Sequence, residues 1–404
     1  MAKKRKTRRG GVDAGNGEAK FWFEGAQAGI AIPTAEIEIF RNNDKFAMLA
    51  NNDVTYENIH ERLDVTFVSS KALEETNRRY KIGGHTLSEN GVKPDETEFE
   101  SKKYASEIIA RSVLAGILVD ALKQKHQEVG SWDFKSVKAS YDIALALPLM
   151  EINPNSFSSH ALRFIGTHEM IFHFPNGQKI EVTIEIEFAS TFPEGAIAVY
   201  PIMYNLDGTY KQYTIEVNGQ TITTDLSQYK ILLTDIGAGT LDLAVMNGVN
   251  YDYNNSKSLD LGTKEDVFSI IEQWNEHDPL NKIDSLTQFT KIYSSKDDFR
   301  TEALVNFASP RLSANSKKIG TEVKNIFKDL GSKSVNVFCG GGSILYRSHL
   351  TKIMNSDSKY QGRTIFSEHD KFTNSLGLLM MMLHEAFDQM KDQYISEVQG
   401  QGQA

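Results

Sequence analysis

Two distant segments of the chain share one short design: an apolar strand that ends at an aspartate, a glycine-rich turn, and a returning strand. They are residues 12–20 (VDAGNGEAK) and 233–243 (LTDIGAGTLDL). Glycines in such turns permit positive φ angles and allow backbone N–H groups to approach an anion. This self-similarity predicts two domains of one design, each presenting a glycine turn, and 404 residues are enough for two domains.

Composition narrows the class of protein further. Apolar residues make up 40% and charged residues 24%, which is typical of a globular protein rather than of a disordered or membrane chain. The single cysteine, Cys339, excludes an internal disulfide and fits a reducing compartment. The longest apolar runs, 143–150 and 376–383, fall short of the ~20 residues that span a bilayer. We therefore expect a cytoplasmic protein without a membrane partner, and the net charge of −9 argues against non-specific coating of nucleic acid.

Hydrophobic periodicity separates strands from helices elsewhere. Residues 31–40 and 64–69 alternate as strands do, and the nearly continuous apolar run at 140–149 predicts a strand buried on both faces. Residues 102–127 have apolar side chains at helical intervals, whereas the charged stretch 80–100 is typical of an exposed loop region. Further predictions are hairpins at 163–188 and 210–223 and helical segments at 193–205, 264–330 and 371–397.

The acidic residues of the two glycine hairpins suggest a metal and phosphate site. Mg²⁺ prefers one or two carboxylates, waters and substrate phosphates, so Asp13 could hold it directly or through water. Lys20 returns on the next strand and can place an ammonium group on a phosphate. If the hairpins faced each other they would hold a polyphosphate from both sides, leaving Asp13 and Asp235 to orient one Mg²⁺. Asp242 is either a neighbour of that metal or a hydrogen-bonding partner across its own hairpin, and we favour the second role.

A third glycine element follows a buried-looking strand at 334–338. Gly340, Gly341 and Gly342 precede Ser343 at the start of a helix, whose free N–H groups offer a partial positive charge to a phosphate or ribose. Three glycines also let a flat group lie against the backbone. Each of the three elements alone is more typical of an ordinary hairpin or turn, so the inference depends on their order and spacing.

In that order the three elements resemble the motifs of the actin-like ATPase superfamily, which includes sugar kinases and heat-shock chaperone ATPases. Its first hairpin is called phosphate-1, its second phosphate-2, and its glycine turn the adenosine motif. Asp13 and Lys20 keep the seven-residue spacing of the phosphate-1 aspartate and lysine. Residues 235–242 match the phosphate-2 pattern Asp-x-Gly-x-Gly/Thr-Thr-x-Asp.

Within the superfamily, shorter segments resemble the bacterial plasmid-segregation actins of the ParM type. These segments are 80–84 (YKIGG), 146–149 (ALPL), 192–195 (FPEG) and 372–377 (FTNSLG), so the resemblance covers nearly the whole chain. Two features depart from it. The stretch from 194 to 235 is longer and carries an extra hairpin. The chain also begins with a basic arm of Lys3, Lys4, Arg5, Lys6, Arg8 and Arg9, either a solvated leader or a contact to DNA or to acidic neighbours in an assembly.

The resemblance implies an α/β, actin-like two-domain fold with duplicated RNase H-like cores around a nucleotide cleft. Domain I would comprise 1–195 plus 370–404, and domain II 196–369. It implies ATP or GTP with Mg²⁺, metal binding by Asp13 and Asp235, and catalysis by these two with Glu194, which could otherwise be a helix-start glutamate. Implied nucleotide contacts are Gly15, Asn16, Gly17, Lys20, Gly237, Ala238, Gly239, Thr240, Gly340, Gly341, Gly342, Ser343 and Tyr346, the last equally plausible as a packing residue.

The function implied is a nucleotide-dependent, filament-forming ATPase that segregates plasmid DNA. Its partners would be further copies of itself and a DNA-binding adaptor protein bound to a centromere-like plasmid site, with no direct DNA contact beyond the basic arm. Two alternatives stay open. One is a cell-shape or phage-encoded cytoskeletal actin homologue; the other is a non-polymerising ATPase or sugar kinase of the same superfamily.

Overall fold

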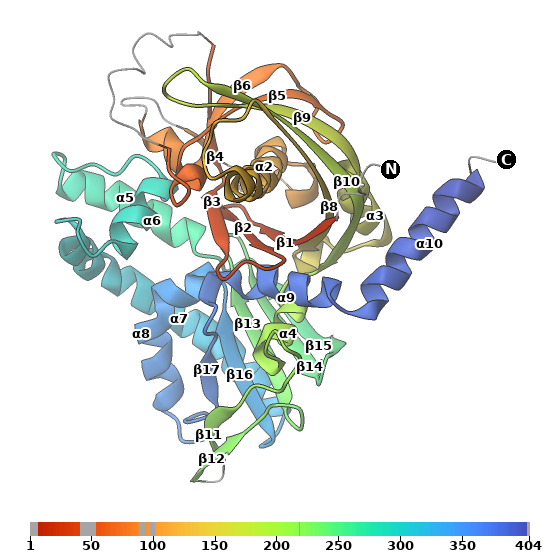
Figure 1. Ribbon diagram of the computed structural model, residues 1–404. Helices are drawn as coiled ribbons and strands as arrows, with labels where there is room; N and C mark the ends of the chain where they lie inside the picture. Colours follow the sequence, from red (N-terminus) through yellow and green to blue (C-terminus); the bar gives the residue numbers. More distant parts are fainter. Residues whose placement is uncertain (1–6, 41–53, 89–93, 97–101, 218, 402–404) are drawn as a thin grey trace.

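The computed structural model describes residues 7–40, 54–88, 94–96, 102–217 and 219–401. It contains two mixed sheets, one above the other in Figure 1, each covered by helices, which is the α/β architecture that the sequence predicts. The strands are β1 (Arg8–Ala14), β2 (Glu18–Phe23), β3 (Ile30–Pro33), β4 (Ala35–Glu38), β5 (Leu63–Ser70), β6 (Arg78–Ile82), β7 (Asp95–Glu96), β8 (Ser136–Leu147), β9 (Gly166–His173), β10 (Lys179–Pro193), β11 (Tyr213–Val217), β12 (Gln220–Thr224), β13 (Lys230–Ile236), β14 (Leu241–Asn247), β15 (Asn250–Leu259), β16 (Ser334–Cys339) and β17 (Thr364–Phe366). The helices are α2 (Glu107–Val129), α3 (Pro154–Phe164), α4 (Val199–Met203), α5 (Lys264–His277), α6 (Leu286–Ser294), α7 (Thr301–Asp329), α8 (Gly341–Asn355), α9 (Thr373–Met382) and α10 (Glu385–Gln401), with 3₁₀ turns η1 (Ile59–Glu61), η2 (Gly83–Ser88), η3 (Lys103–Ala105), η4 (Leu149–Glu151), η5 (Ala196–Ala198) and η6 (Asp370–Phe372).

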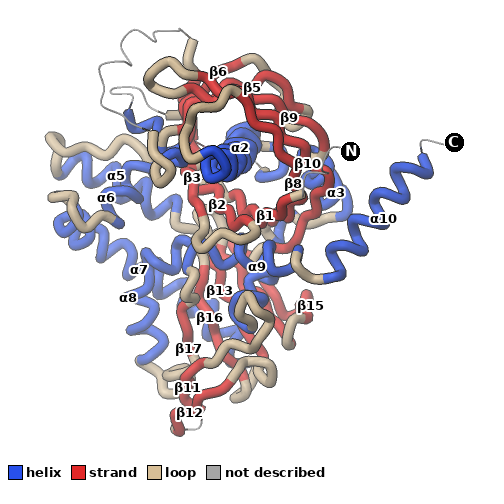
Figure 2. The backbone as a smooth tube through the Cα atoms, viewed as in Figure 1, coloured by secondary structure: helices blue, strands red, loops and turns tan. Residues whose placement is uncertain are grey.

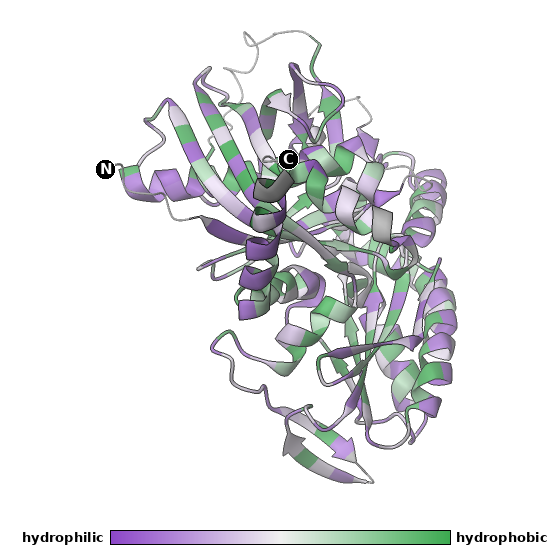
Figure 3. Ribbon diagram, turned by 90° about the vertical axis from the view of Figure 1, so that its right-hand side faces the viewer, coloured by the Kyte–Doolittle hydropathy of each residue, from purple (hydrophilic) through white to green (hydrophobic). Residues whose placement is uncertain are grey.

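The larger sheet curves around α2. Among the described residues it has ten strands in the order β3-β2-β1-β8-β10-β9-β5-β6-β4-β7, and Figure 1 shows them enclosing the helix. Every residue of α2 from Ile109 to Leu122 is buried, which is expected for a helix that packs on all sides. The helix begins at Glu107 because the Ser106 side chain accepts a hydrogen bond from the N–H of Ile109. Along most of β10 exposed and buried residues alternate, because one strand face points to solvent, and Figure 3 shows hydrophilic and hydrophobic residues alternating along strands of this sheet.

Strand β8 lies in the middle of this sheet and is buried on both faces, as its sequence predicts. Ile143 and Leu145 pack into the core around α2, whereas Ala144 and Ala146 pack on the other face with α9 and α10. Successive side chains of a strand point to opposite faces, so an apolar run is required where both faces are covered. The continuous run at 140–149 therefore marks the centre of the sheet.

The smaller sheet has the order β15-β14-β13-β16-β17 within the described residues. Leu232 and Ile236 of β13 pack against α5, α7 and α8 on one face. Ile231 and Leu233 pack on the other face against the short α4 segment and the hairpin β11–β12. Figure 2 shows α7 and α8 on one side of this sheet and β11–β12 at its far end. The helical region predicted at 264–330 corresponds to α5, α6 and α7.

The last predicted helix is divided in two, which corrects the continuous helix expected over 371–397. Helix α9 crosses between the two sheets, and α10 leaves the body of the molecule at an angle (Figure 1). His384 separates them, and its Nδ1 accepts a hydrogen bond from the N–H of Ala386 at 3.2 Å. A side-chain acceptor at this position satisfies a free N–H in the first turn of α10 and so stabilises the start of that helix. Phe387 is nevertheless fully buried and ties α10 to β8.

Two further expectations need correction. The stretch 80–100 is not wholly an exposed loop: residues 78–82 form β6 between β4 and β5, which buries Tyr80 and Ile82. Arg8 and Arg9, assigned to the basic arm, lie in β1. Arg8 forms an ion pair with Asp120, and Arg9 forms one with Asp388 of α10. The other basic residues of the arm, Lys3 to Lys6, fall outside the described residues. None of the described helices combines the length and the apolar character needed to cross a bilayer.

His160 in α3 is a buried, neutral side chain in the larger sheet's packing. Its Nδ1 lies 3.3 Å from Thr191 Oγ1 of β10. Burial lowers the pKa of His160 from 6.5 to about 3, and the positive charges of Arg163 and Lys103 add to the shift. Between about pH 3 and pH 6.5 the unfolded chain binds a proton at this histidine that the folded chain does not. The free energy of unfolding is therefore highest above pH 6.5 and decreases as the pH falls through this range.

We expect His160→Gln to flatten the pH dependence of stability. Between about pH 6 and about pH 4 the wild-type free energy of unfolding should fall by up to about 1.4 kcal/mol more per pH unit than that of the variant. Urea denaturation at several pH values measures this slope. The same substitution at the exposed His277 controls for the loss of a histidine. Equal slopes for the wild type and His160→Gln would contradict the buried neutral ring.

Candidate functional site

The two glycine hairpins place a charged side chain directly opposite each aspartate. Asp13 at the end of β1 pairs with Lys20 of β2, and Asp235 of β13 pairs with Asp242 of β14. In both hairpins the residue seven positions after the aspartate therefore lies directly opposite it on the neighbouring strand. In the first hairpin this neighbour is a cation, and in the second it is another carboxylate.

The two turns are closed by equivalent hydrogen bonds. The N–H of Gly15 donates to the carbonyl of Glu18, and the N–H of Gly237 donates to the carbonyl of Thr240, each at 2.9 Å. The Thr240 hydroxyl also donates to Asp242 Oδ2 at 2.9 Å. Asp242 thus makes a hydrogen bond within its own hairpin, to a residue two positions earlier and not across the strand pair.

The turns face each other between the two sheets. A Cβ atom added to Gly17 would lie 3.4 Å from the Cβ of Ala238, and one added to Gly239 would lie 3.2 Å from Asn16 Nδ2. The Leu286 side chain at the start of α6 lies 3.7 Å from the same Gly17 position. Four of the predicted phosphate-binding residues are therefore brought together from opposite sheets.

Asn374, near the start of α9, links the two aspartates. Its Nδ2 donates to Asp235 Oδ2 at 2.6 Å and lies 3.5 Å from Asp13 Oδ2, a distance at the outer limit of a hydrogen bond. Its Oδ1 is buried and has no hydrogen-bond partner among the described residues. Because one nitrogen reaches both carboxylates, they converge on one point, with an unsatisfied acceptor beside them.

The two aspartates differ in their electrostatic environment. Burial tends to raise the pKa of Asp13, but the ammonium groups of Lys20, 3.6 Å away, and of Lys103 bring that pKa below its ordinary value. Burial together with the charges of Asp13 and Asp242 raises the pKa of Asp235 to about 6. The second hairpin therefore lacks positive charge, a condition that a bound cation relieves.

Glu194 lies in the same space, directly after β10. A Cβ added to the next residue, Gly195, would lie 3.9 Å from the Cβ of Asp235, so this loop passes over the second hairpin. Burial raises the pKa of Glu194 well above its ordinary value, and an ion pair with Lys103 opposes that shift. The structure thus brings the predicted catalytic carboxylate beside both predicted metal ligands.

The residues present fit a Mg²⁺ ion that is completed by a substrate. Within the described part of the chain no three His, Cys, Asp or Glu side chains form a group that could hold a metal. Mg²⁺ does not require one, since it usually keeps several waters and binds one or two carboxylates plus substrate phosphates. Asp13 and Asp235 converge as such a pair, and the unsatisfied Asn374 Oδ1 can accept a hydrogen bond from a metal-bound water.

The glycine run before α8 packs against the end of β13. Gly340 has a φ of +81°, and a Cβ atom there would lie 2.1 Å from Asp235 Oδ1; one on Gly342 would lie 2.4 Å from Ile236 Cγ2. A Cβ on Gly341 would meet nothing within 4 Å. Ser343 is buried, and its hydroxyl donates to the carbonyl of Gly340 at 2.8 Å. Gly340 and Gly342 therefore permit close packing, and Gly341 is the position with space for a flat group.

Tyr346 lies inside the core of the smaller sheet. It is fully buried, its hydroxyl donates to Asp266 Oδ2 at 2.7 Å and accepts a hydrogen bond from Asn315 Nδ2 at 3.0 Å. Of the two roles that the sequence left open, these contacts favour packing over contact with a base.

Two residues of the site were not predicted. Lys103 follows the exposed Lys102 in a charged stretch, and nothing in the sequence distinguishes the two lysines. Asn374 did carry a signal, because it lies in the segment 372–377 that resembles the returning helix of plasmid-segregation actins. Its position between the aspartates depends on α9 packing against β1, a contact between opposite ends of the chain.

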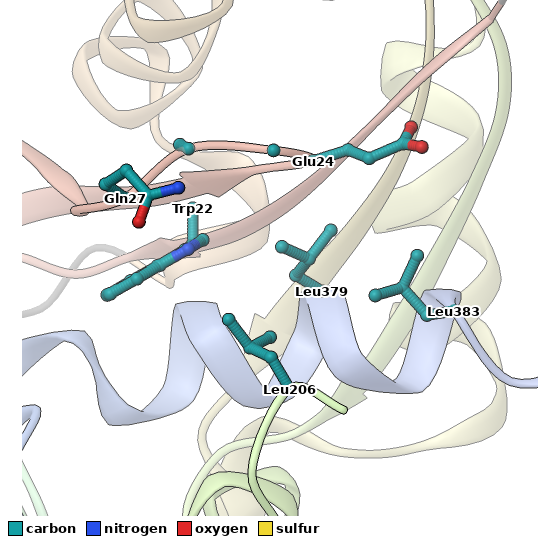
Figure 4. Close-up of a pocket in the computed structure, with 8 residues that line it drawn as sticks. Trp22, Glu24, Gln27, Leu206, Leu379 and Leu383 are labelled. Atoms are coloured by element: carbon teal, nitrogen blue, oxygen red, sulfur yellow. The ribbon is translucent and has the colours of Figure 1, made fainter. Parts of the chain in front are cut away.

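A separate pocket of about 240 Å³ lies at the other end of α9 from Asn374. Figure 4 shows Trp22, Leu206, Leu379 and Leu383 around it, with Glu24 at its margin. Its lining is mostly apolar and its charged residue is acidic, so this pocket does not suit a phosphate. The phosphate-binding residues that the sequence predicts lie instead where the two glycine turns meet.

Facing glycine hairpins on two sheets, joined by a returning helix, define the class: the chain has the actin-like fold. The crystal structure of the actin-like protein Alp7A is similar, with a TM-score of 0.69 and 18% identity over 97% of this chain and 100% of that one. Bacillus thuringiensis ParM solved with ATP is similar with a TM-score of 0.59 and 17% identity, over 95% of this chain and 100% of that one. A non-polymerisable quadruple mutant of pCBH ParM is similar with a TM-score of 0.62 and 15% identity, over 93% of this chain and 99% of that one.

Bacillus thuringiensis ParM has also been solved with ADP and with AMPPNP. Neither a family model nor a curated protein matches this sequence. Because the identities to the solved structures are 18% or lower, the likeness establishes the fold.

We predict that Gly340→Ala disrupts the site while Gly341→Ala does not. Alanine at position 340 would adopt a positive φ, at a cost of about 1–3 kcal/mol, and would displace the Asp235 carboxylate. Thermal denaturation and nucleotide binding by a fluorescent analogue measure the two effects. Gly341→Ala is the matched control, since a Cβ has open space there. Equal behaviour of the two variants would contradict the close packing described for Gly340.

Proposed function

We propose that this protein is a Mg²⁺-dependent, actin-like ATPase that hydrolyses a nucleoside triphosphate between its two glycine hairpins and couples hydrolysis to filament assembly. The observation that carries the proposal is the convergence of Asp13, Asp235 and Glu194 where the turns face each other. The nucleotides bound to Bacillus thuringiensis ParM support this class of ligand. The substrate is ATP or GTP.

In the proposed reaction, a water oxygen forms a bond to the γ-phosphorus. The bond from that phosphorus to the β–γ bridging oxygen breaks, and its electron pair leaves with the diphosphate. Glu194 accepts a proton from the water and later releases it to the solvent or to the phosphate product. Positioning and charge stabilisation supply most of the rate in such phosphoryl transfers.

The chain's own residues prepare this step. Lys20 neutralises phosphate charge at the first turn, and Asn374 keeps the two aspartates together. A Mg²⁺ ion bound by Asp13 and Asp235 would neutralise charge on the phosphates. Gly341 leaves space beside the start of α8 for the base.

We assign residues 1–195 and 370–404 to domain I and residues 196–369 to domain II, with the nucleotide between them. Closure of the two domains on a triphosphate would favour one shape for assembly. A tenfold change in affinity between subunits needs only about 1.4 kcal/mol. Head-to-tail contacts that do not close into a ring produce a helical filament, so hydrolysis could destabilise the filament through small changes at one interface.

We further propose that the filament separates plasmid DNA through a DNA-binding adaptor at a centromere-like site. The likeness to the plasmid-segregation actins supports this assignment. Arg8 and Arg9 are engaged in ion pairs within the fold. A small DNA-binding protein encoded next to repeated sites would support this role.

We expect Asp13→Ala and Asp235→Ala each to abolish turnover and leave the protein folded. Each removes a ligand of the cation, so phosphate release should fall at least about 100-fold. Phosphate release with ATP and with GTP, with and without sugars, measures turnover and separates a kinase from a hydrolase. Circular dichroism provides the folding control. Unchanged hydrolysis in either variant would contradict the proposed site.

We expect the wild-type protein to sediment as a polymer with ATP and Mg²⁺ and to remain in the supernatant with ADP. The terminal phosphate should favour the closed shape that assembles. Ultracentrifugation followed by electron microscopy of the pellet tests this. The Asp13→Ala variant is the matched control for nucleotide dependence. If no nucleotide yields a pellet while hydrolysis persists, the filament proposal is wrong and a non-polymerising ATPase remains.

A further inference from the structure

Lys103 has a position that the hydrolytic scheme above does not use. It begins η3, just before α2, and its side chain is buried. Its Nζ forms an ion pair with Glu194 Oε1. A Cβ atom added to Gly15 in the first turn would lie 4.0 Å from the same Nζ. One ammonium group therefore lies within reach of both the proposed base and the first phosphate turn.

The backbone around Lys103 is held from two sides. Its N–H donates to Glu151 Oε2 at 3.0 Å. Arg163 Nη1 donates to the carbonyls of Tyr104 at 3.0 Å and Ser106 at 3.2 Å. Because the backbone is fixed, Nζ can change partner through rotation of the Lys103 side chain alone. The fixed backbone also reduces the conformational entropy that is lost when Nζ forms a contact.

The charges around the turns show why a second lysine matters. Lys20 lies opposite Asp13, 3.6 Å from its carboxylate, and so serves the first hairpin. Glu194 lies beside both Asp13 and Asp235, and its ionic partner is Lys103. A buried carboxylate without a partner is strongly disfavoured, so the ion pair with Lys103 holds the Glu194 carboxylate in one orientation.

We propose that Lys103 is a positioning residue of the hydrolytic site, which orients Glu194 toward the attacking water and contacts the terminal phosphate when a triphosphate is bound. The inference rests on the proposed function. With a diphosphate, Lys103 pairs with Glu194 alone. With a triphosphate it is shared between the carboxylate and the γ-phosphate, so Glu194 stays in place beside the attacking water.

A purely structural ion pair gives different expectations. It would contribute to stability, and its loss would weaken the binding of both nucleotides equally. The ratio of affinities for a triphosphate analogue and a diphosphate therefore distinguishes the two roles. This ratio requires no turnover and can be measured with AMPPNP and ADP.

The decisive comparison is Lys103→Met with Lys102→Met. Lys102 precedes Lys103 in the same segment but is exposed, so its replacement removes the same charge outside the site. We expect Lys103→Met to lower kcat by about 100-fold and the AMPPNP-to-ADP affinity ratio by about tenfold, since a hydrogen bond between charged groups is lost. Lys102→Met should match the wild type in both quantities.

Rescue by a conservative variant tests the role of the charge. Lys103→Arg retains a cation, so the affinity ratio should return to within about threefold of the wild-type value. Turnover should recover less, because a planar guanidinium cannot take the position of a compact ammonium beside Glu194. A structural pair would show no such separation between affinity and turnover.

The inference is overturned if Lys103→Met matches Lys102→Met in both turnover and affinity ratio. If Lys103→Met does not fold, Glu194→Gln is compared with the double variant Lys103→Met/Glu194→Gln, in which no carboxylate is left unpaired. A lower affinity ratio in the double variant supports the inference, and an equal ratio overturns it. A wild-type protein that binds neither AMPPNP nor ADP gives a different result, the failure of the proposed function itself.

Discussion

The structure depends on the convergence of buried carboxylates at the meeting point of two sheets. Asp13, Glu194, Asp235 and Asp242 are all buried there, and Lys20 and Lys103 are the cations paired with two of them. Burying like charges together is unfavourable unless cations and hydrogen bonds compensate. The arrangement is therefore stable only with its lysines and Asn374 in place, and a metal with a polyphosphate would complete the compensation around Asp235.

The fold supplies this convergence by using one hairpin twice. In each copy the strand ends at an aspartate, the turn closes through equivalent hydrogen bonds, and the residue seven positions later lies across the strand pair. The copies differ at that last residue: Lys20 in one and Asp242 in the other. One carboxylate is consequently held ionised by a neighbouring cation, whereas the pKa of the other is raised to about 6. The duplicated geometry thus produces an electrostatically asymmetric site.

Several elements connect this site to the rest of the molecule. Helix α9 packs against β1 and carries Asn374 between the two hairpins, so its position and the state of the aspartates are linked. Glu96 of β7, in the larger sheet, accepts hydrogen bonds from Thr287 of α6, which packs with the smaller sheet. These contacts join elements of the larger sheet to elements that pack with the smaller one.

The sequence alone determined the two hairpins, the buried centre of the larger sheet and the aspartates at the strand ends, because these follow from local periodicity and glycine spacing. It did not distinguish Lys103 from Lys102, assign Tyr346 to packing, or show that Arg8 belongs to β1. It also missed the break at His384. Apart from the break at His384, which a local hydrogen bond accompanies, each of these depends on contacts between residues far apart in the chain, such as Lys103 with Glu194. Only the tertiary structure, which sets burial and brings distant charges together, decided which polar residues belong to the site.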